Sequence, residues 1–186
     1  MAERGSENAP RLHSVAAEKG DGMATENRVQ LSSDLRVSLQ EFYFRYAECL
    51  DGGRLEQWPE FFLDACVYRL TTRRALRLGP DEDLVSIRTK GALRDRIVAI
   101  GQSEDYEPHT QRHFISNFRV QVSGEDELRV QVNVQVLRTY PGRETELLAC
   151  GQYSDRVAVA GGRFNFREKI CVLDADVAPS DLVYPV

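Results

Sequence analysis

The sequence predicts an α+β fold in which a curved β-sheet wraps around helices that come first along the chain. Three observations predict this fold: apolar residues repeat with a helical period early in the chain, strand-like segments fill the second half, and turn sequences separate those segments. Helices followed by a run of strands are typical of α+β domains. The 186 residues, 42% of them hydrophobic, suffice for one core, so we expect a single domain over residues 31–186.

Residues 1–30 differ from the rest in being polar, with interspersed Gly and Ala and no sustained apolar period. We expect them to form a flexible N-terminal extension in which His13 is solvated. Met23 lies inside this extension and is an alternative start to Met1.

The first predicted helix follows this extension. Ser33 or Asp34 is expected to cap its start, and Asp51 with the two following glycines is expected to end it. Its apolar positions follow steps of four, three, four and four: Leu35, Leu39, Phe42, Tyr46 and Leu50.

Two further helical segments are predicted, a short one at "RLEQWPEFF" that restarts at Pro59 and a longer one at "TKGALRDRIVAIG". Aromatic residues crowd the first part of the chain, and we expect them to form the core on the helix side. A ligand cavity lined by some of them is the alternative. They are Phe42, Tyr43, Phe44, Tyr46, Trp58, Phe61 and Phe62.

Five strands are predicted, at residues 65–72, 113–122, 128–139, 146–159 and 163–174. In the third, four valines alternate with polar residues, which is typical of a half-buried antiparallel strand. Between the last two strands, Gly161 and Gly162 predict a tight hairpin turn that needs positive φ.

The charge balance and cysteine spacing exclude several classes of function. The chain has 24 basic and 29 acidic residues, a net charge of -5, so nucleic acid is not an expected partner. No apolar run reaches the roughly 20 residues that span a bilayer, and there is no secretory signal, so we expect a cytoplasmic protein. Cys49, Cys66, Cys150 and Cys171 lie too far apart to predict an iron–sulfur cluster, and we expect buried thiols.

The stretch "YEPHTQRHFIS" places His109 and His113 four residues apart, with Arg112 between them. With a third ligand, two histidines at this spacing could bind zinc or iron, but no convincing third ligand is evident. We therefore predict no metal site, and we interpret the stretch as a structural or interfacial polar cluster. His109 follows Pro108, so we expect it in the loop before the strand.

Arg73 and Arg74 belong to a second candidate contact surface. They open "RRALRLGPDEDL", in which basic residues are followed by acidic ones. A solvated loop is the expectation for such a mixed run, and a docking loop for a partner subunit is the alternative.

The order of elements fits the cone-shaped α+β barrel of the nuclear-transport-factor-2-like (NTF2-like, SnoaL-like) class. From about Leu39 onward the chain also resembles the small (β) subunits of aromatic-ring-hydroxylating dioxygenases. The resemblance rests on the order of "EFYFRYAECLDGGRLEQWPEFFLDACVYRL", "RDRIVAI", "QRHFISNFRV", "LLACGQYSD" and "FREKICVLDADV". The "QWPEFF" segment and the "LVYPV" ending are most similar to the salicylate hydroxylase and terephthalate dioxygenase branch.

The resemblance implies a non-catalytic, cofactor-free small subunit that supports the assembly and stability of an oxygenase acting on an aromatic carboxylate. The large (α) subunit of that family carries a Rieske 2Fe-2S cluster and a mononuclear Fe(II). Three α and three β subunits commonly assemble, and a ferredoxin or reductase supplies electrons. His109, Arg112, His113, Arg73 and Arg74 are then our candidates for the subunit interface.

The same cone-shaped class also implies an alternative, because several of its members are dehydratases or isomerases that use a His and an Asp in the barrel mouth. The acid–base residues would be His113, Asp51, Tyr46 and Glu168. Glu168 is expected on an apolar strand face, where desolvation would raise its pKa, although pairing with an arginine is the favoured interpretation. That apolar face would comprise Phe164, Phe166, Ile170 and Val172.

Overall fold

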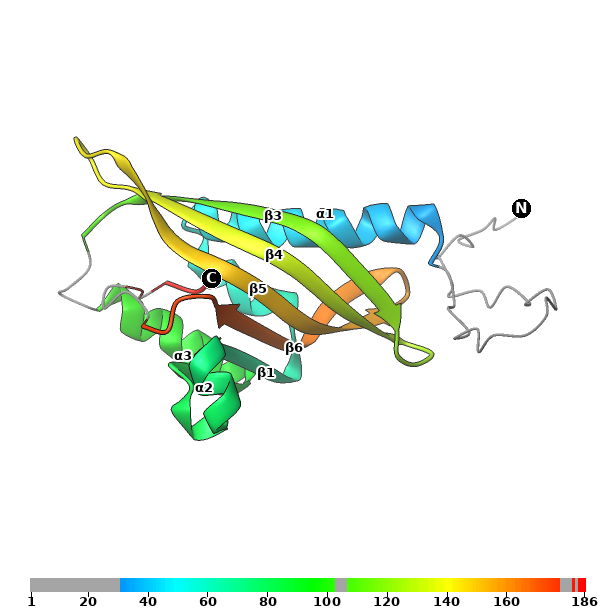
Figure 1. The fold of residues 1–186 in the computed structure, drawn as a ribbon. Helices are drawn as coiled ribbons and strands as arrows, with labels where there is room; N and C mark the ends of the chain where they lie inside the picture. The colour runs from blue at the N-terminus through cyan, green and yellow to red at the C-terminus, as the bar shows by residue number, and fades with distance from the viewer. Residues whose placement is uncertain (1–30, 103–106, 178–181, 183) are drawn as a thin grey trace, which may run out of the picture.

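The computed structural model describes residues 31–102, 107–177, 182 and 184–186. The predicted extension at residues 1–30, with His13 and both candidate start methionines, lies outside these residues. The described chain folds as helices packed on one curved, mixed sheet (Figure 1). This confirms the predicted α+β architecture.

Three α-helices and two short 3-10 helices alternate with the first two strands. The helices are α1 (Ser33–Asp51), η1 (Leu55–Phe61), α2 (Arg73–Leu78), η2 (Pro80–Glu82) and α3 (Lys90–Gly101). The strands are β1 (Phe62–Thr72), β2 (Val85–Thr89), β3 (Thr110–Val122), β4 (Glu127–Thr139), β5 (Thr145–Ala160) and β6 (Arg163–Leu173).

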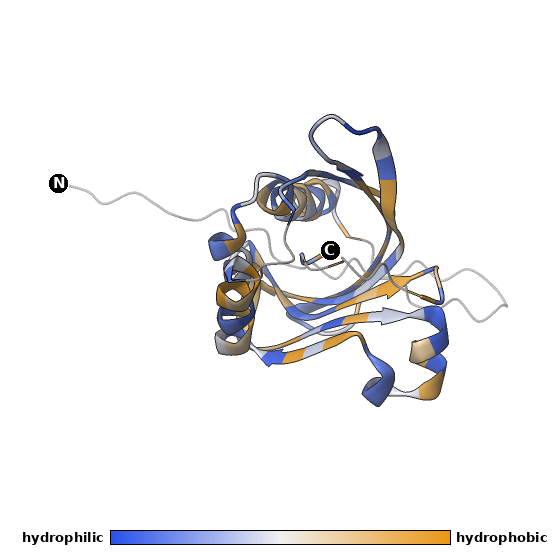
Figure 2. Cartoon of the chain, turned by 90° about the vertical axis from the view of Figure 1, so that its left-hand side faces the viewer, coloured by the Kyte–Doolittle hydropathy of each residue, from blue (hydrophilic) through white to orange (hydrophobic). Residues whose placement is uncertain are grey.

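The six strands form one sheet in the order β2-β1-β6-β5-β4-β3. Neighbouring strands are antiparallel except β1 and β6, which run parallel. The sheet therefore has two edges, β2 and β3, and is open where these edges lie. Its curvature around the helices gives the predicted cone (Figure 2).

Helix α1 fills the concave side of the sheet because one of its faces is almost entirely apolar and aromatic. Phe42, Tyr43 and Tyr46 on this face are each at most 2% exposed. The cap is Ser32, whose side chain accepts a hydrogen bond from the Leu35 N–H, rather than the predicted Ser33 or Asp34. Ser33, predicted as the cap, is therefore the first residue of the helix itself.

The prediction of a loop at "RRALRLGPDEDL" was wrong. Thr72 caps a short helix there, α2, by accepting a hydrogen bond from the Ala75 N–H. Asp83, which follows Gly79 and η2, forms a bidentate ion pair with Arg69 of β1. The Asp83 carboxylate is 1% exposed. The chain then forms strand β2, which the sequence analysis also missed.

The remaining strands follow the predicted segments closely. β3 begins at Thr110, three residues before its predicted start, and His109 lies in the preceding loop as predicted. The β5–β6 hairpin turns at Gly161 (φ 55°) and Gly162 (φ 76°), which confirms the predicted positive φ values.

Gly151 of β5 has no room for a side chain, because a Cβ atom there would lie 2.1 Å from the backbone oxygen of Val172 in β6. We expect Gly151→Ala to lower the free energy of unfolding by about 1–3 kcal/mol, as in other overpacked sites. Urea unfolding followed by circular dichroism measures this loss. Gly91→Ala is the matched control, because its Cβ would have no neighbour closer than 3.9 Å; an equal loss in the control would contradict the prediction.

Candidate functional site

The interior of the cone contains a fully buried ion pair. Lys169 of β6 and Asp155 of β5 have side chains that are 0% exposed, and the Lys169 Nζ lies 3.3 Å from Asp155 Oδ2. The Tyr43 hydroxyl donates a hydrogen bond of 2.6 Å to the same carboxylate oxygen. Burial raises the pKa of Asp155, while Lys169 and Tyr43 act in the opposite direction by stabilising the carboxylate.

Aromatic rings surround the ammonium group of Lys169. Its Nζ lies 3.2 Å from the ring centroid of Tyr153 and 4.6 Å from that of Tyr46. Such contacts stabilise a cation that is removed from water. Burial in turn raises the pKa of both phenols well above the ordinary value of 10, so they act here as neutral hydroxyls.

A β-bulge in β6 places Lys169 inside and Glu168 outside, so the prediction that Glu168 lies on the apolar face was wrong. In the β5–β6 register, Arg156 pairs with Glu168 and Val157 with Phe166, which leaves Arg167 as an extra residue. Beyond the bulge the inward positions become Lys169, Cys171 and Leu173. Ile170 and Val172, predicted with Glu168, lie on the other face and are half-buried. The positive neighbours of Glu168 are Arg69 and Arg156.

His113 and Asp51 form a second interior pair. The His113 Nδ1 lies 2.6 Å from Asp51 Oδ1, and the His113 backbone N–H donates to both carboxylate oxygens. The His113 side chain is 0% exposed and that of Asp51 10%. Among the described residues, His113 Nε2 is buried without a hydrogen-bond partner. The structure thus brings together two of the four acid–base candidates, in an arrangement suited to proton transfer at Nε2.

Tyr46, the third candidate, is held by other groups. Its hydroxyl accepts a hydrogen bond from Trp58 Nε1 at 3.1 Å and donates to the backbone oxygen of Val186 at 3.2 Å. Val186 is 1% exposed and is part of the core. In Figure 2 the C-terminal label accordingly lies within the ring formed by α1 and the curved sheet.

The residues predicted for the subunit interface lie in the loop before β3, in β3 and in α2. His109 Nδ1 lies 2.8 Å from the Glu107 backbone oxygen, and its ring contacts those of Tyr140 and Tyr184. Arg112 is exposed on edge strand β3, whereas His113 points inward, where it cannot touch a partner directly.

In α2, Arg73 and Arg74 are exposed, and Arg73 pairs with Asp174 at 2.7 Å. Within the described ranges, no group of three His, Cys, Asp or Glu residues is placed to hold a metal ion.

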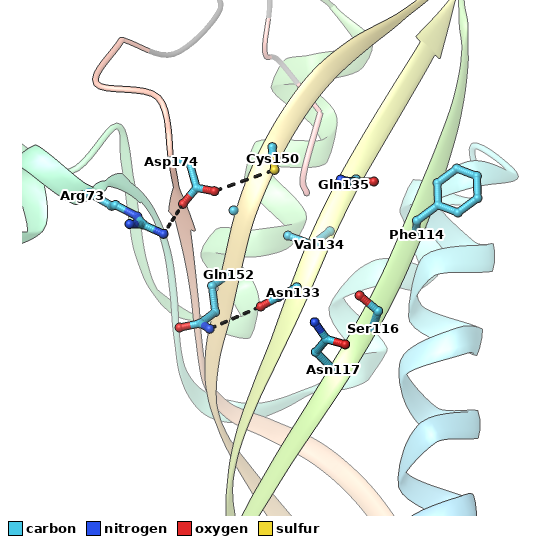
Figure 3. A pocket seen from close by; sticks show the side chains of 11 residues that line it. Arg73, Phe114, Ser116, Asn117, Asn133, Val134, Gln135, Cys150, Gln152 and Asp174 are labelled. Carbon is cyan, nitrogen blue, oxygen red and sulfur yellow. Dashed lines mark hydrogen bonds and ion pairs between the residues drawn. The ribbon is translucent and has the colours of Figure 1, made fainter.

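A polar hollow of about 320 Å³ lies on the outer face of the sheet (Figure 3). Side-chain amides dominate its floor, and Gln152 Nε2 donates to Asn133 Oδ1 across β4 and β5. It is rimmed by the exposed ring of Phe114 and by the Arg73–Asp174 pair. The lining includes Ser116, Asn117, Asn133, Gln135, Cys150 and Gln152.

Sequence reasoning missed Lys169, Asp155 and Tyr153. The sequence did indicate that Asp155 faces inward, because Tyr153, Asp155 and Val157 are at alternate positions of one strand and so lie on the same face. Tyr153 and Val157 are apolar enough to place that face against the core. Lys169 had no such signal, since the bulge reverses the alternation only at Arg167.

Fold and interior together define a cone-shaped α+β protein whose inner space is filled by aromatic side chains, the Lys169–Asp155 ion pair, the hydrogen-bonded His113–Asp51 pair and a segment of its own chain. The family model of the SnoaL-like domain matches residues 32–169, and the chain belongs to this family. Membership confirms the NTF2-like class predicted from the order of elements.

Proteins similar in sequence to this chain include small subunits of oxygenases. The chain is 29% identical to the anthranilate 1,2-dioxygenase small subunit of Burkholderia cepacia, over 84% of this chain and 98% of that protein. It is also 29% identical to the terminal oxygenase component subunit beta 1 of terephthalate 1,2-dioxygenase from Comamonas, over 81% and 97%.

A solved structure is also similar. It is the β subunit of a putative aromatic-ring-hydroxylating dioxygenase from Novosphingobium aromaticivorans, with a TM-score of 0.73 and 28% identity over 81% of this chain and 95% of that chain. None of the helices in the described ranges is long and apolar enough to cross a membrane.

The buried pair can be tested by a double-mutant cycle. We expect Lys169→Met and Asp155→Asn each to lower the free energy of unfolding by about 3–5 kcal/mol, because each leaves an uncompensated buried charge. The double variant should lose less than the sum of the two, with a coupling of about 1–3 kcal/mol in urea unfolding. The exposed Arg73–Asp174 pair is the control, with an expected coupling below about 1 kcal/mol; equal coupling in both cycles would refute the assignment.

Proposed function

We propose that this chain is the non-catalytic small (β) subunit of a multicomponent aromatic-ring-hydroxylating oxygenase. The observation that carries the proposal is the similarity to small subunits over nearly their whole length, 98% and 97% of the two relatives. The similar β-subunit structure supports it, with 28% identity and the same cone-shaped fold.

The interior of the cone supports a structural role. Trp58, Tyr43, Tyr46, Tyr68 and Tyr153 are fully buried there, and the His113 side chain is closed off from solvent. In the full chain, a substrate would first have to displace residues 184–186, which pack among these side chains. The donor groups that a Rieske cluster or a mononuclear iron needs do not gather among the described residues. Both centres belong, in this proposal, to a large (α) partner subunit.

The assembly proposed is three α and three β subunits, with electrons supplied by a ferredoxin or reductase, and an aromatic carboxylate as substrate. Anthranilate and terephthalate, in the names of the two relatives, are both aromatic carboxylates. The exposed groups Arg112, Arg73 and Arg74 and the half-buried His109 are the proposed contacts with neighbouring subunits. Arginine suits this role because its guanidinium group can bind a partner carboxylate through two hydrogen bonds.

One observation favours a second candidate function, a stand-alone dehydratase or isomerase. The buried His113–Asp51 pair, whose Nε2 has no hydrogen-bond partner in the part of the chain that the structure describes, is an arrangement that can move a proton. Glu168 no longer supports this alternative, because the bulge carries it to the outer face.

Coexpression with a large (α) subunit of an aromatic-ring-hydroxylating oxygenase tests the proposal. We expect the two chains to purify as one complex in equal numbers, with all iron in the large subunit and none bound stoichiometrically by this chain alone. Sedimentation and iron analysis measure these properties. A monomer that ignores the large subunit, or close to one iron per isolated chain, would contradict the assignment.

Substitutions near the start of β3 distinguish the proposed subunit function from the alternative acid–base function. We expect Arg112→Ala to weaken assembly and His113→Ala to destabilise the chain by about 1–3 kcal/mol, because Asp51 loses its partner. Turnover per intact complex should stay within a few fold of the parent. Loss of a general acid or base would instead lower turnover by roughly a hundredfold or more with assembly intact. Gel filtration and turnover rates measured on the same preparations distinguish the two functions. Arg129→Ala, at an exposed position of β4, is the control.

A further inference from the structure

Residues 184–186 enter the cone and end inside it without joining the sheet. Tyr184 is half-buried, and its ring meets that of His109 edge to face at 5.6 Å. Pro185 and Val186 are buried beyond it, and the segment has no helical or strand structure. Val186 is therefore held by side chains of the interior rather than by a backbone ladder.

Three side-chain donors converge on the backbone oxygen of Val186. They are the Tyr46 hydroxyl of α1 at 3.2 Å, the Tyr68 hydroxyl of β1 at 3.5 Å and the Cys171 thiol of β6 at 3.1 Å. The Trp58 indole N–H donates to the Tyr46 oxygen and so leaves the Tyr46 proton free to point at Val186. Burial holds the pKa of Cys171 at about 12, which keeps this thiol a donor.

The surroundings of this oxygen are those of a small-molecule site. Apolar and aromatic walls with a few convergent polar groups are the usual features of such sites. Here Trp58 and Tyr68 pack edge to face at 5.0 Å. In the same interior the Tyr153 hydroxyl and His113 Nε2 are fully buried without hydrogen-bond partners among the described residues.

We infer that the interior of the cone is a binding site for a small acyl compound, a carboxylic acid or amide on a short branched or aromatic body, and that residues 184–186 occupy this site in cis. The Val186 oxygen takes the place of the acyl oxygen, and its isopropyl group takes the place of the apolar body. If residues 184–186 moved out of the interior, each of the three donors would lose its hydrogen-bond acceptor. The emptied site would therefore favour a ligand that supplies an acyl oxygen and an apolar group in their place. This inference does not depend on the proposed subunit role.

The test compares the full chain with a variant that ends at residue 183, using benzoate, benzamide and the tripeptide Tyr-Pro-Val as probes. In the full chain, the Cys171 thiol should resist iodoacetamide and the probes should leave the melting temperature unchanged. In the shortened chain, Cys171 should be alkylated roughly tenfold faster or more, because its cover is gone. The tripeptide, and benzoate, benzamide or both, should raise the melting temperature and restore the protection.

Peptide mapping by mass spectrometry separates Cys171 from the other thiols. If only benzoate raises the melting temperature and protects Cys171, the ligand class is a carboxylic acid. If benzamide has these effects, the ligand class is a neutral acyl compound. Tyr68→Phe in the shortened chain should weaken the effect of every probe. If the shortened chain is unfolded alone, saturating tripeptide should refold it.

A folded shortened chain that neither benzoate nor benzamide protects would overturn the inference, even if the tripeptide protects it. So would an unfolded one that no probe refolds, or a full chain that binds benzoate as tightly as the shortened one.

Discussion

The buried Lys169–Asp155 pair is the interaction on which the interior arrangement depends. It joins β5 and β6, and through Tyr43 it also joins α1 to the sheet. Removing two charges from water is costly, and the cost is offset only if the geometry is good and the remaining hydrogen-bonding groups are satisfied. Tyr43 donates one hydrogen bond to the carboxylate, and the rings of Tyr43, Tyr46 and Tyr153 surround the ammonium group. The condition is met only in part, because Asp155 Oδ1 is buried without a hydrogen-bond partner among the described residues. The positions of these rings then determine the shape of the space that remains for the C-terminal residues.

The same constraint explains how a fold with acid–base groups in its centre can serve as a structural subunit. Asp51, His113, Asp155 and Lys169 are all directed inward, and each carboxylate lies against a nitrogen of its partner. These four side chains are at most 10% exposed, whereas the arginines of α2 and Arg112 of β3 are exposed to solvent.

Most of the fold was predictable because periodicity along the chain reports burial directly. Helix α1 and strand β4 have clean apolar periods, and both were found with nearly correct limits. α2 and β2 were missed because they are short and flank a Gly-Pro step, so their stability comes from the Thr72 cap and the Arg69–Asp83 pair rather than from a pattern.

The interior site was less predictable. One bulged residue reversed the faces of β6, and the pairing of His113 with Asp51, 62 positions away, follows from tertiary structure alone.

The buried position of Val186 has a practical consequence for anyone who handles this protein. An affinity tag or fluorescent domain fused directly behind Val186 would have to begin inside the aromatic interior, against Tyr46, Tyr68 and Cys171. Such a fusion would pull the last residues out and expose apolar surface, which invites aggregation. A tag attached elsewhere leaves these contacts of Val186 in place, so the point of attachment decides whether the native interior survives purification.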